Sequence, residues 1–175
     1  MGGTVAMAKE QTEDWKSTLD NQPEHLRLIG LISVEMSNLE IWLADVFCDV
    51  CAGKPTIMQA VYFAPRAAML RVDMLIDAAK AAMALKEEEF REIDLLRAVA
   101  LGSRAKRLLE KRNKIMHGAW SVVPETKEVH LERAQGSKRR EESKPFTTEE
   151  LRGLVRDIRL LIGDVMLLLG WRDVE

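Results

Sequence analysis

The stretch that decides the fold closes a long helical pattern just before the first strand-like segment: Lys111-Arg112-Asn113-Lys114-Ile115-Met116-His117-Gly118. Steps of three and four back along the chain trace a row that is apolar except for one arginine: Leu101, Ala105, Leu108, Arg112, Ile115. A charge without a partner in a buried row is costly. Arg112 therefore needs either a carboxylate partner or a function.

The composition predicts one helical domain. The chain has 175 residues, of which 47% are hydrophobic and 31% charged, with few aromatic residues. That length can bury a core without disulfides or a metal. We expect an all-α fold, a four- to five-helix up-and-down bundle over residues 21–175 with a small β-hairpin before the last helix. Residues 1–20 are expected to be flexible or to form a short helix.

The first long helix is predicted to begin at Asn21, with Asn21 as N-cap and Pro23 in the first turn. It should end between Gly53 and Pro55. Its buried stripe recurs at helical spacing: Leu28, Ile32, Met36, Leu39, Leu43, Val46, Val50.

The next helical pattern runs from a Thr56 cap to about Leu85, and Pro65 must kink or split it. Val61 and Ala68 are among its expected inward residues. A turn is placed between Leu85 and Glu87, followed by an acidic first turn of the third long helix.

A hairpin is predicted from two short strands, Trp120 to Val123 and Glu128 to Leu131. A polar loop from Ala134 to Lys144 follows. Thr147 to Glu150 then form a capping box that opens the last helix. The apolar arc of that helix is wide enough to suggest that it also packs on a second copy of the chain.

Several function classes are excluded by the sequence. The formal net charge of −2 argues against binding nucleic acid by bulk charge, so contact with a polyanion needs a local patch. Cys48 and Cys51 lack zinc-ligand partners, which fits core or flank positions in the reducing cytoplasm. No segment is a credible membrane span. Asp73 and Asp77 share a helical face without a third ligand, and we expect neither a metal nor a cofactor.

The densest basic cluster lies on the third long helix, with the single acid Glu110 among its cations: Arg104, Lys106, Arg107, Lys111, Arg112, Lys114. A solvated helical face accounts for several of them, because cations near a helix C-terminus are favourable. A patch that contacts phosphate is the functional alternative, in which Arg107, Lys111 and Lys114 bind RNA. The two interpretations are compatible.

Arg112-Asn113, three residues, and His117 resemble the Arg-x(4-6)-His signature of the HEPN superfamily, in its Arg-Asn-x-x-x-His form. The context agrees: the motif closes a helix, and His117-Gly118 and Trp120 lead into a hairpin and a capped last helix. The resemblance covers roughly Pro23 to Trp171.

The resemblance implies a dimeric, metal-independent endoribonuclease whose sites are built from both copies of the motif. It implies His117 as general acid and base for attack of the ribose 2′-hydroxyl, giving a cyclic phosphate. Arg112 would stabilise the phosphorane charge and Asn113 would orient the site. Such families serve in toxin–antitoxin and phage-defence systems, with an antitoxin or other defence protein as partner, and some members are silent dimeric binding or scaffold modules.

A structural interpretation competes with this. Arg112 could be tied to a carboxylate, Glu35 or Glu40, while Asn113 and His117 merely close the helix and bond to the hairpin. Geometry adds a constraint, because residues five apart are about 140° apart on a helix. Either the helix unwinds at His117, or the working Arg–His pair forms across two chains. His25 and His130 are predicted to be surface residues.

Overall fold

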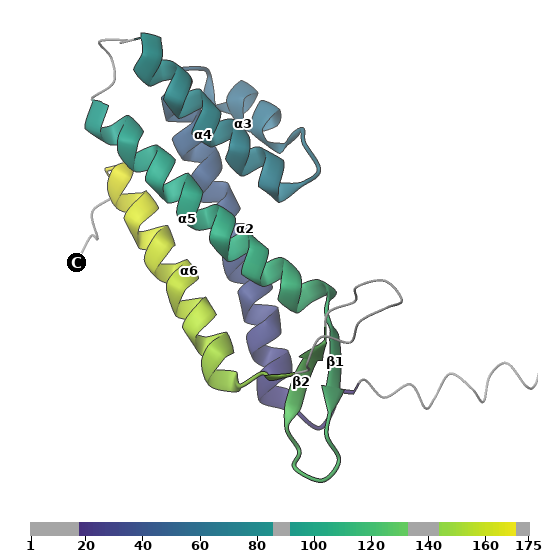
Figure 1. Cartoon of the computed structure of the whole chain (residues 1–175). Coiled ribbons are helices and arrows are strands. Elements are labelled where there is room, and N and C mark those ends of the chain that lie inside the picture. The colour runs from purple at the N-terminus through teal and green to yellow at the C-terminus, as the bar shows by residue number, and fades with distance from the viewer. Residues whose placement is uncertain (1–17, 86–91, 133–143, 171–175) are drawn as a thin grey trace, which may run out of the picture.

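The computed structural model describes residues 18–85, 92–132 and 144–170 and has five helices in these ranges (Figure 1). They follow one another with a small sheet before the last: α2 (Pro23–Val50), α3 (Pro55–Phe63), α4 (Ala68–Leu85), α5 (Glu92–His117), β1 (Ala119–Val122), β2 (Val129–Glu132), β3 (Lys144–Pro145), α6 (Thr148–Leu168). The predicted all-α bundle with a hairpin before the last helix is therefore confirmed. Three predictions concern parts of the chain outside the described residues: residues 1–17, the turn that follows Leu85, and the loop before Lys144.

Helix α2 is the central element, and all seven residues of its predicted stripe are buried. It packs most extensively on α6, and the two run in the same direction, because Arg152 of α6 contacts Glu24 and Arg159 contacts Glu35. The predicted N-cap is wrong. Gln22 occupies that position without a side-chain capping bond to the helix, and Pro23 begins the helix. Cys48 is buried, Cys51 is exposed, and both are free thiols.

Pro65 splits the second helical pattern, as predicted, into α3 and α4. Thr56 does not cap α3, because Lys54 is its N-cap and Pro55 fills the first turn. Tyr62 of the short α3 packs against Phe47 of α2, with the two ring centroids 5.4 Å apart. Val61, predicted to point inward, is exposed in consequence.

Helices α4 and α5 pack closely because Gly102 leaves room for Ile76. A Cβ on Gly102 would approach Cγ1 of Ile76 to 2.7 Å. Lys106 of α5 also contacts Asp73 of α4 at 2.8 Å. The two helices thus run antiparallel, and α5 extends beyond the start of α4 at its own C-terminal end (Figure 1).

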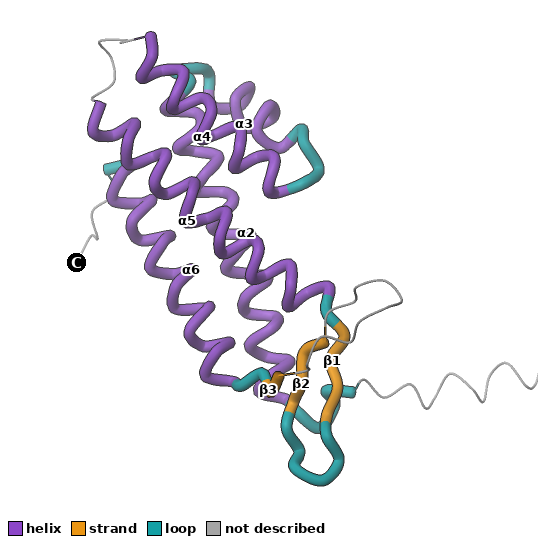
Figure 2. Tube along the Cα trace, viewed as in Figure 1, coloured by secondary structure: helices purple, strands orange, loops and turns teal. Residues whose placement is uncertain are grey.

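The hairpin pairs Trp120 with Leu131 and Val122 with Val129, and β3 adds a short third strand that the sequence did not predict (Figure 2). The prediction for His25 is wrong. This side chain is only 8% exposed, and its Nε2 bonds to the carbonyl oxygen of Phe146 at 3.1 Å. His25 thereby holds the segment before α6 against the start of α2.

The predicted capping box of α6 is confirmed, with Thr147 accepting from the Glu150 amide and Glu150 accepting from the Thr147 amide. Its buried residues include Leu151, Leu154, Ile158 and Leu161. Within the described ranges, none of the helices combines the length and apolar character needed to cross a membrane.

Candidate functional site

The Arg-Asn-x-x-x-His motif occupies the last two turns of α5, and His117 is the final residue of that helix. Two contacts fix this end. Trp120 Nε1 donates to the carbonyl oxygen of Ile115 at 3.1 Å, and Ser33 of α2 donates to the sulfur of Met116 at 3.4 Å. The first satisfies one of the carbonyls that a helix C-terminus leaves open. The helix therefore does not unwind before His117, and the motif is held by both α2 and the hairpin.

Arg112 is half-buried in the row that also contains the buried residues Leu108 and Ile115. Its Nη1 donates to Oδ1 of Asn113 at 3.1 Å. Among the described residues, no carboxylate forms an ion pair with Arg112. The guanidinium of Arg112 is thus not neutralised by a described carboxylate, and it can bind an anion.

Glu35 and Glu40, the carboxylates considered as partners of Arg112, form ion pairs with other arginines. Glu35 contacts Nη2 of Arg159 on α6 at 2.7 Å, although its side chain is only 12% exposed. Glu40 pairs with Arg71 on α4, which also lies over the Phe63 ring. Periodicity placed both glutamates on the flanks of α2 correctly, but their partners depend on which helices pack there.

Asn113 lies between Arg112 and His117 in angle around α5. On an ideal helix it lies about 100° from Arg112 and about 40° from His117. Because an arginine can only donate, the atom facing it must be the amide oxygen, which leaves Nδ2 of Asn113 as a donor. The bond draws the guanidinium toward the helix face that Asn113 shares with His117. The sequence did not predict this Arg112–Asn113 hydrogen bond. It left open only unwinding of the helix at His117 or an Arg–His pair formed across two chains.

His117 is exposed, and no hydrogen bond to the hairpin is found for it in the described ranges. Asn113 likewise bonds to Arg112 rather than to the hairpin. The interpretation in which the motif only closes the helix requires Arg112 to pair with a carboxylate. It also requires Asn113 and His117 to bond to the hairpin. The described contacts show neither.

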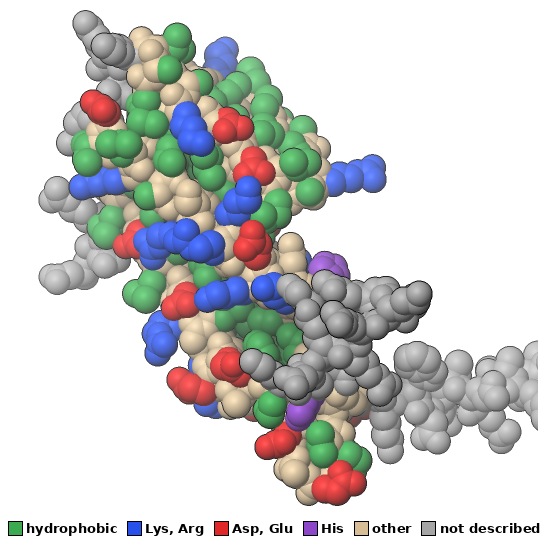
Figure 3. Space-filling model, in the orientation of Figure 1, with side chains coloured by type: hydrophobic (Ala, Val, Ile, Leu, Met, Phe, Trp, Pro, Cys, Tyr) green, Lys and Arg blue, Asp and Glu red, His purple; other side chains and the backbone are tan. Residues whose placement is uncertain are grey.

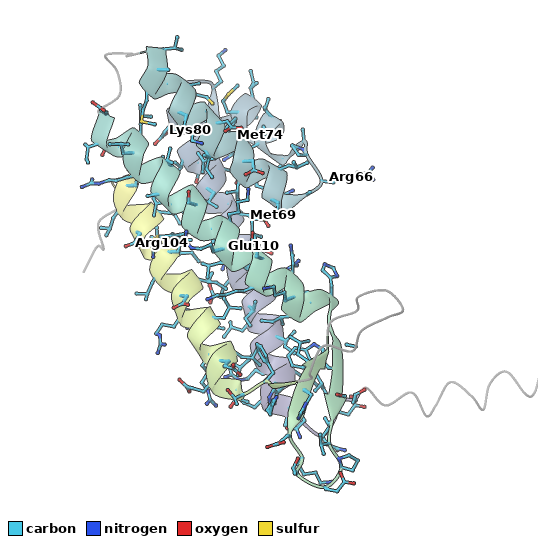
Figure 4. The ribbon with its side chains drawn as sticks, viewed as in Figure 1. Arg66, Met69, Met74, Lys80, Arg104 and Glu110 are labelled. Carbon is cyan, nitrogen blue, oxygen red and sulfur yellow. The ribbon has the colours of Figure 1, made fainter. Side chains whose placement is uncertain are left out.

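The basic cluster is partly neutralised by its neighbours, and cations and anions alternate across this face (Figure 3). Arg104 pairs with Asp164 between α5 and α6 (Figure 4), and Lys106 pairs with Asp73. Lys111 lies 3.9 Å from Asp157. An ion-paired helical face therefore accounts for half of the cluster, and phosphate contact by the rest stays a prediction.

The three predicted RNA-binding residues, Arg107, Lys111 and Lys114, are all exposed. They share one stripe of α5 at spacings of four and three. Arg107 and Lys114 have no acidic partner in the described part of the chain. Lys111 directly precedes the motif, and Lys114 lies within it, three residues before His117.

Sequence reasoning missed a second group of cations, where Arg27 of α2 meets Arg152, Arg156 and Arg159 of α6 along a groove. The spacing of four and three within α6 was a signal that these arginines share a face.

His130, predicted to be a surface residue, has a side chain only 14% exposed, 3.7 Å from Glu128.

No cluster of three or more metal-binding side chains occurs in the described ranges. Asp73, weighed as a metal ligand, instead accepts from Lys106. The chain matches no protein-family model, no curated protein and no solved structure.

Proposed function

We propose that the chain is a metal-independent endoribonuclease of the HEPN type that acts as a cytoplasmic homodimer, with Arg112, Asn113 and His117 as its catalytic residues. One observation carries the proposal. Arg112 is half-buried in an apolar row, yet the two carboxylates best placed by sequence to neutralise it are bound by Arg159 and Arg71. A half-buried arginine without a carboxylate partner among the described residues fits a phosphate-binding role better than a packing role.

The chemistry assigns one role to each side chain. Neutral His117 takes the proton of a ribose 2′-hydroxyl while the 2′-oxygen forms a bond to phosphorus. The bond from phosphorus to the 5′-oxygen breaks, and an imidazolium returns a proton to that leaving oxygen. The products are a 2′,3′-cyclic phosphate and a 5′-hydroxyl. Arg112 and the Nδ2 donor of Asn113 stabilise the charge that develops on the non-bridging oxygens.

A second chain supplies the second proton-transfer group in this proposal. Proton removal and proton return occur on opposite sides of the phosphorus, so two imidazoles serve the reaction better than one. Apolar side chains near the motif would provide a surface for the second copy, since Met116, which contacts Ser33, and Val34, the residue after Ser33, are exposed. Arg107, Lys111 and Lys114 would contact flanking phosphates. We place the activity in toxin–antitoxin or phage defence, with an antitoxin or other defence protein as further partner.

A silent HEPN-like dimer that serves as a binding or scaffold module is the second candidate. The observation that favours it is the neutralisation of Arg104 and Lys106 by aspartates, which leaves a weak field for attracting RNA. This candidate predicts a dimer with no cleavage of any RNA.

The test is cleavage of a mixed-sequence single-stranded RNA in EDTA, with the ends analysed for cyclic phosphate. The proposed function predicts cyclic phosphate ends with wild-type protein and none with His117→Ala. A growth defect on expression that His117→Ala relieves would count against the scaffold. Absence of cleavage by wild-type protein across structured and unstructured RNAs would instead support it.

A further inference from the structure

A groove of about 710 Å³ runs between α2 and α6, and no residue of α5 lines it. Its floor is apolar, formed by Leu28, Leu31 and Val155. Leu160 and Leu167 stand beside it, 59% and 66% exposed. At Gly163 a Cβ would meet nothing within 4 Å, so the groove is open there. Apolar side chains are thus left uncovered among polar ones on this side of the bundle.

Arginines border this apolar surface: Arg27, Arg152, Arg156 and Arg159. Glu24 orients two of them, contacting Arg27 at 2.8 Å and Arg152 at 2.9 Å. Hydrogen bonds from these two arginines lower the pKa of Glu24 to about 2, so it stays ionised at neutral pH. Arg156 has no acidic partner in the described ranges. Arg159 is paired with Glu35, and Asp164, which also lines the groove, is bound by Arg104.

From this combination we infer that the α2–α6 groove is a docking site for an acidic amphipathic helix of another protein. The partner's apolar stripe would lie on Leu31, Leu160 and Leu167, and its flanking carboxylates would pair with Arg156 and Arg27. Arginines already held by in-chain glutamates lose little conformational freedom on binding. From Arg152 to Leu167 the groove spans about 23 Å of helix, which matches a partner segment of about 16 residues.

Charge distinguishes this occupant from a second copy of the chain. From Thr148 to Leu168, α6 carries three arginines and four acids, Glu149, Glu150, Asp157 and Asp164. Docking α6 of a second copy would therefore bring almost no net charge, and it would add three arginines to a groove whose Arg156 already lacks an acidic partner among the described residues. An acidic partner brings carboxylates without these arginines.

The lining also distinguishes a protein partner from a nucleic acid. None of the described lining residues is aromatic, so bases would have no ring on which to stack. The exposed leucines suit apolar side chains better than a phosphate backbone. The inference does not depend on the proposed ribonuclease function, because the groove and the end of α5 share no residue.

The experiment uses the full-length protein and a fluorescein-labelled peptide of about 16 residues, with leucine at helical three- and four-residue spacing and glutamate elsewhere. A matched peptide carries lysine in place of glutamate. Fluorescence anisotropy should show binding of the glutamate peptide only, weakened about tenfold or more by Arg156→Glu. Gly163→Gln, which fills the groove without a charge change, should weaken it as well.

Lys80→Glu is the matched control, since it makes the same charge change on α4, away from the groove (Figure 4). It should leave peptide binding unchanged, and circular dichroism should show all variants folded. Equal binding by wild type, Arg156→Glu and Gly163→Gln would overturn the inference. So would conversion of a dimer to a monomer by Arg156→Glu in light scattering, or displacement of the peptide by single-stranded RNA. RNA cleavage in EDTA should be the same for Arg156→Glu as for wild type.

Discussion

The guanidinium of Arg112 donates to the amide oxygen of Asn113 at 3.1 Å, although the two side chains leave α5 about 100° apart. This bond draws a cation from the apolar row toward the face that carries His117. Arg112, the Nδ2 donor of Asn113 and the imidazole of His117 all lie on the last two turns of α5. The Arg112–Asn113 contact is the feature from which the predicted chemistry follows.

Asn113→Asp should abolish most RNA cleavage while leaving the helical fold intact. A carboxylate beside Arg112 would pair with it, neutralise the phosphate-binding cation and remove the Nδ2 donor. We expect a loss of about 100-fold in cleavage rate, the scale of one lost donor to a developing oxyanion. Asn38→Asp on the exposed part of α2 is the matched control and should cleave normally. Wild-type rates with Asn113→Asp would remove the Arg112–Asn113 hydrogen bond from the mechanism.

Mixing two inactive variants tests whether the site uses both chains. Arg112→Ala and His117→Ala, each inactive alone, are co-expressed with different tags, and the heterodimer is isolated. If His117 of one chain works with Arg112 of the other, the heterodimer recovers part of the cleavage, because one combination retains an Arg112 and a His117 and lacks only the second imidazole. Recovery is not expected if each site uses only its own chain. Cleavage by a confirmed heterodimer that is no faster than cleavage by either variant alone would therefore contradict the shared site.

His25→Leu should destabilise the protein, because it leaves the carbonyl oxygen of Phe146 without its buried partner. The expected loss in free energy of unfolding is about 1–3 kcal/mol. Urea denaturation measures it. Leu26→Ala, one position along and 41% exposed, should change stability by about 0.5 kcal/mol or less. Equal effects of the two substitutions would mean that His25 does not hold the segment before α6.

Glu24 should titrate at a pH of about 2, because hydrogen bonds from Arg27 and Arg152 lower its pKa from 4.5. A lowered folded-state pKa contributes stability that is present above pH 4.5 and is lost as the pH falls toward 2. Carboxyl NMR of the wild type and of Arg152→Gln measures the shift. The variant should raise the Glu24 pKa toward 4.5. An identical titration in both proteins would show that Arg152 does not act on Glu24.

Local rules account for what the sequence predicted correctly. The spacing of apolar residues identified the buried stripe of α2, Pro65 marked the break between α3 and α4, and Thr147 with Glu150 marked the start of α6. Each of these signals acts within a few residues of chain, so it can be read without knowing the fold.

The errors arose where distant elements meet. His25 is buried because a carbonyl 121 residues away lies against it. Glu35 and Glu40 have different partners because α6 and α4 pack on opposite flanks of α2. Val61 is exposed because α3 is too short to bury more than the face that carries Tyr62. The Arg112–Asn113 bond joins neighbouring residues, but whether Arg112 would find a carboxylate instead depended on these same distant pairings.

The most direct measurement is the single-turnover rate of RNA cleavage in EDTA by His117→Ala beside Lys80→Ala, an exposed substitution on α4 outside the motif. Loss of a general acid and base lowers rates by about 100- to 10,000-fold. The proposed function predicts a loss of at least about 100-fold for His117→Ala and a wild-type rate for Lys80→Ala. Equal cleavage by the two variants would contradict it.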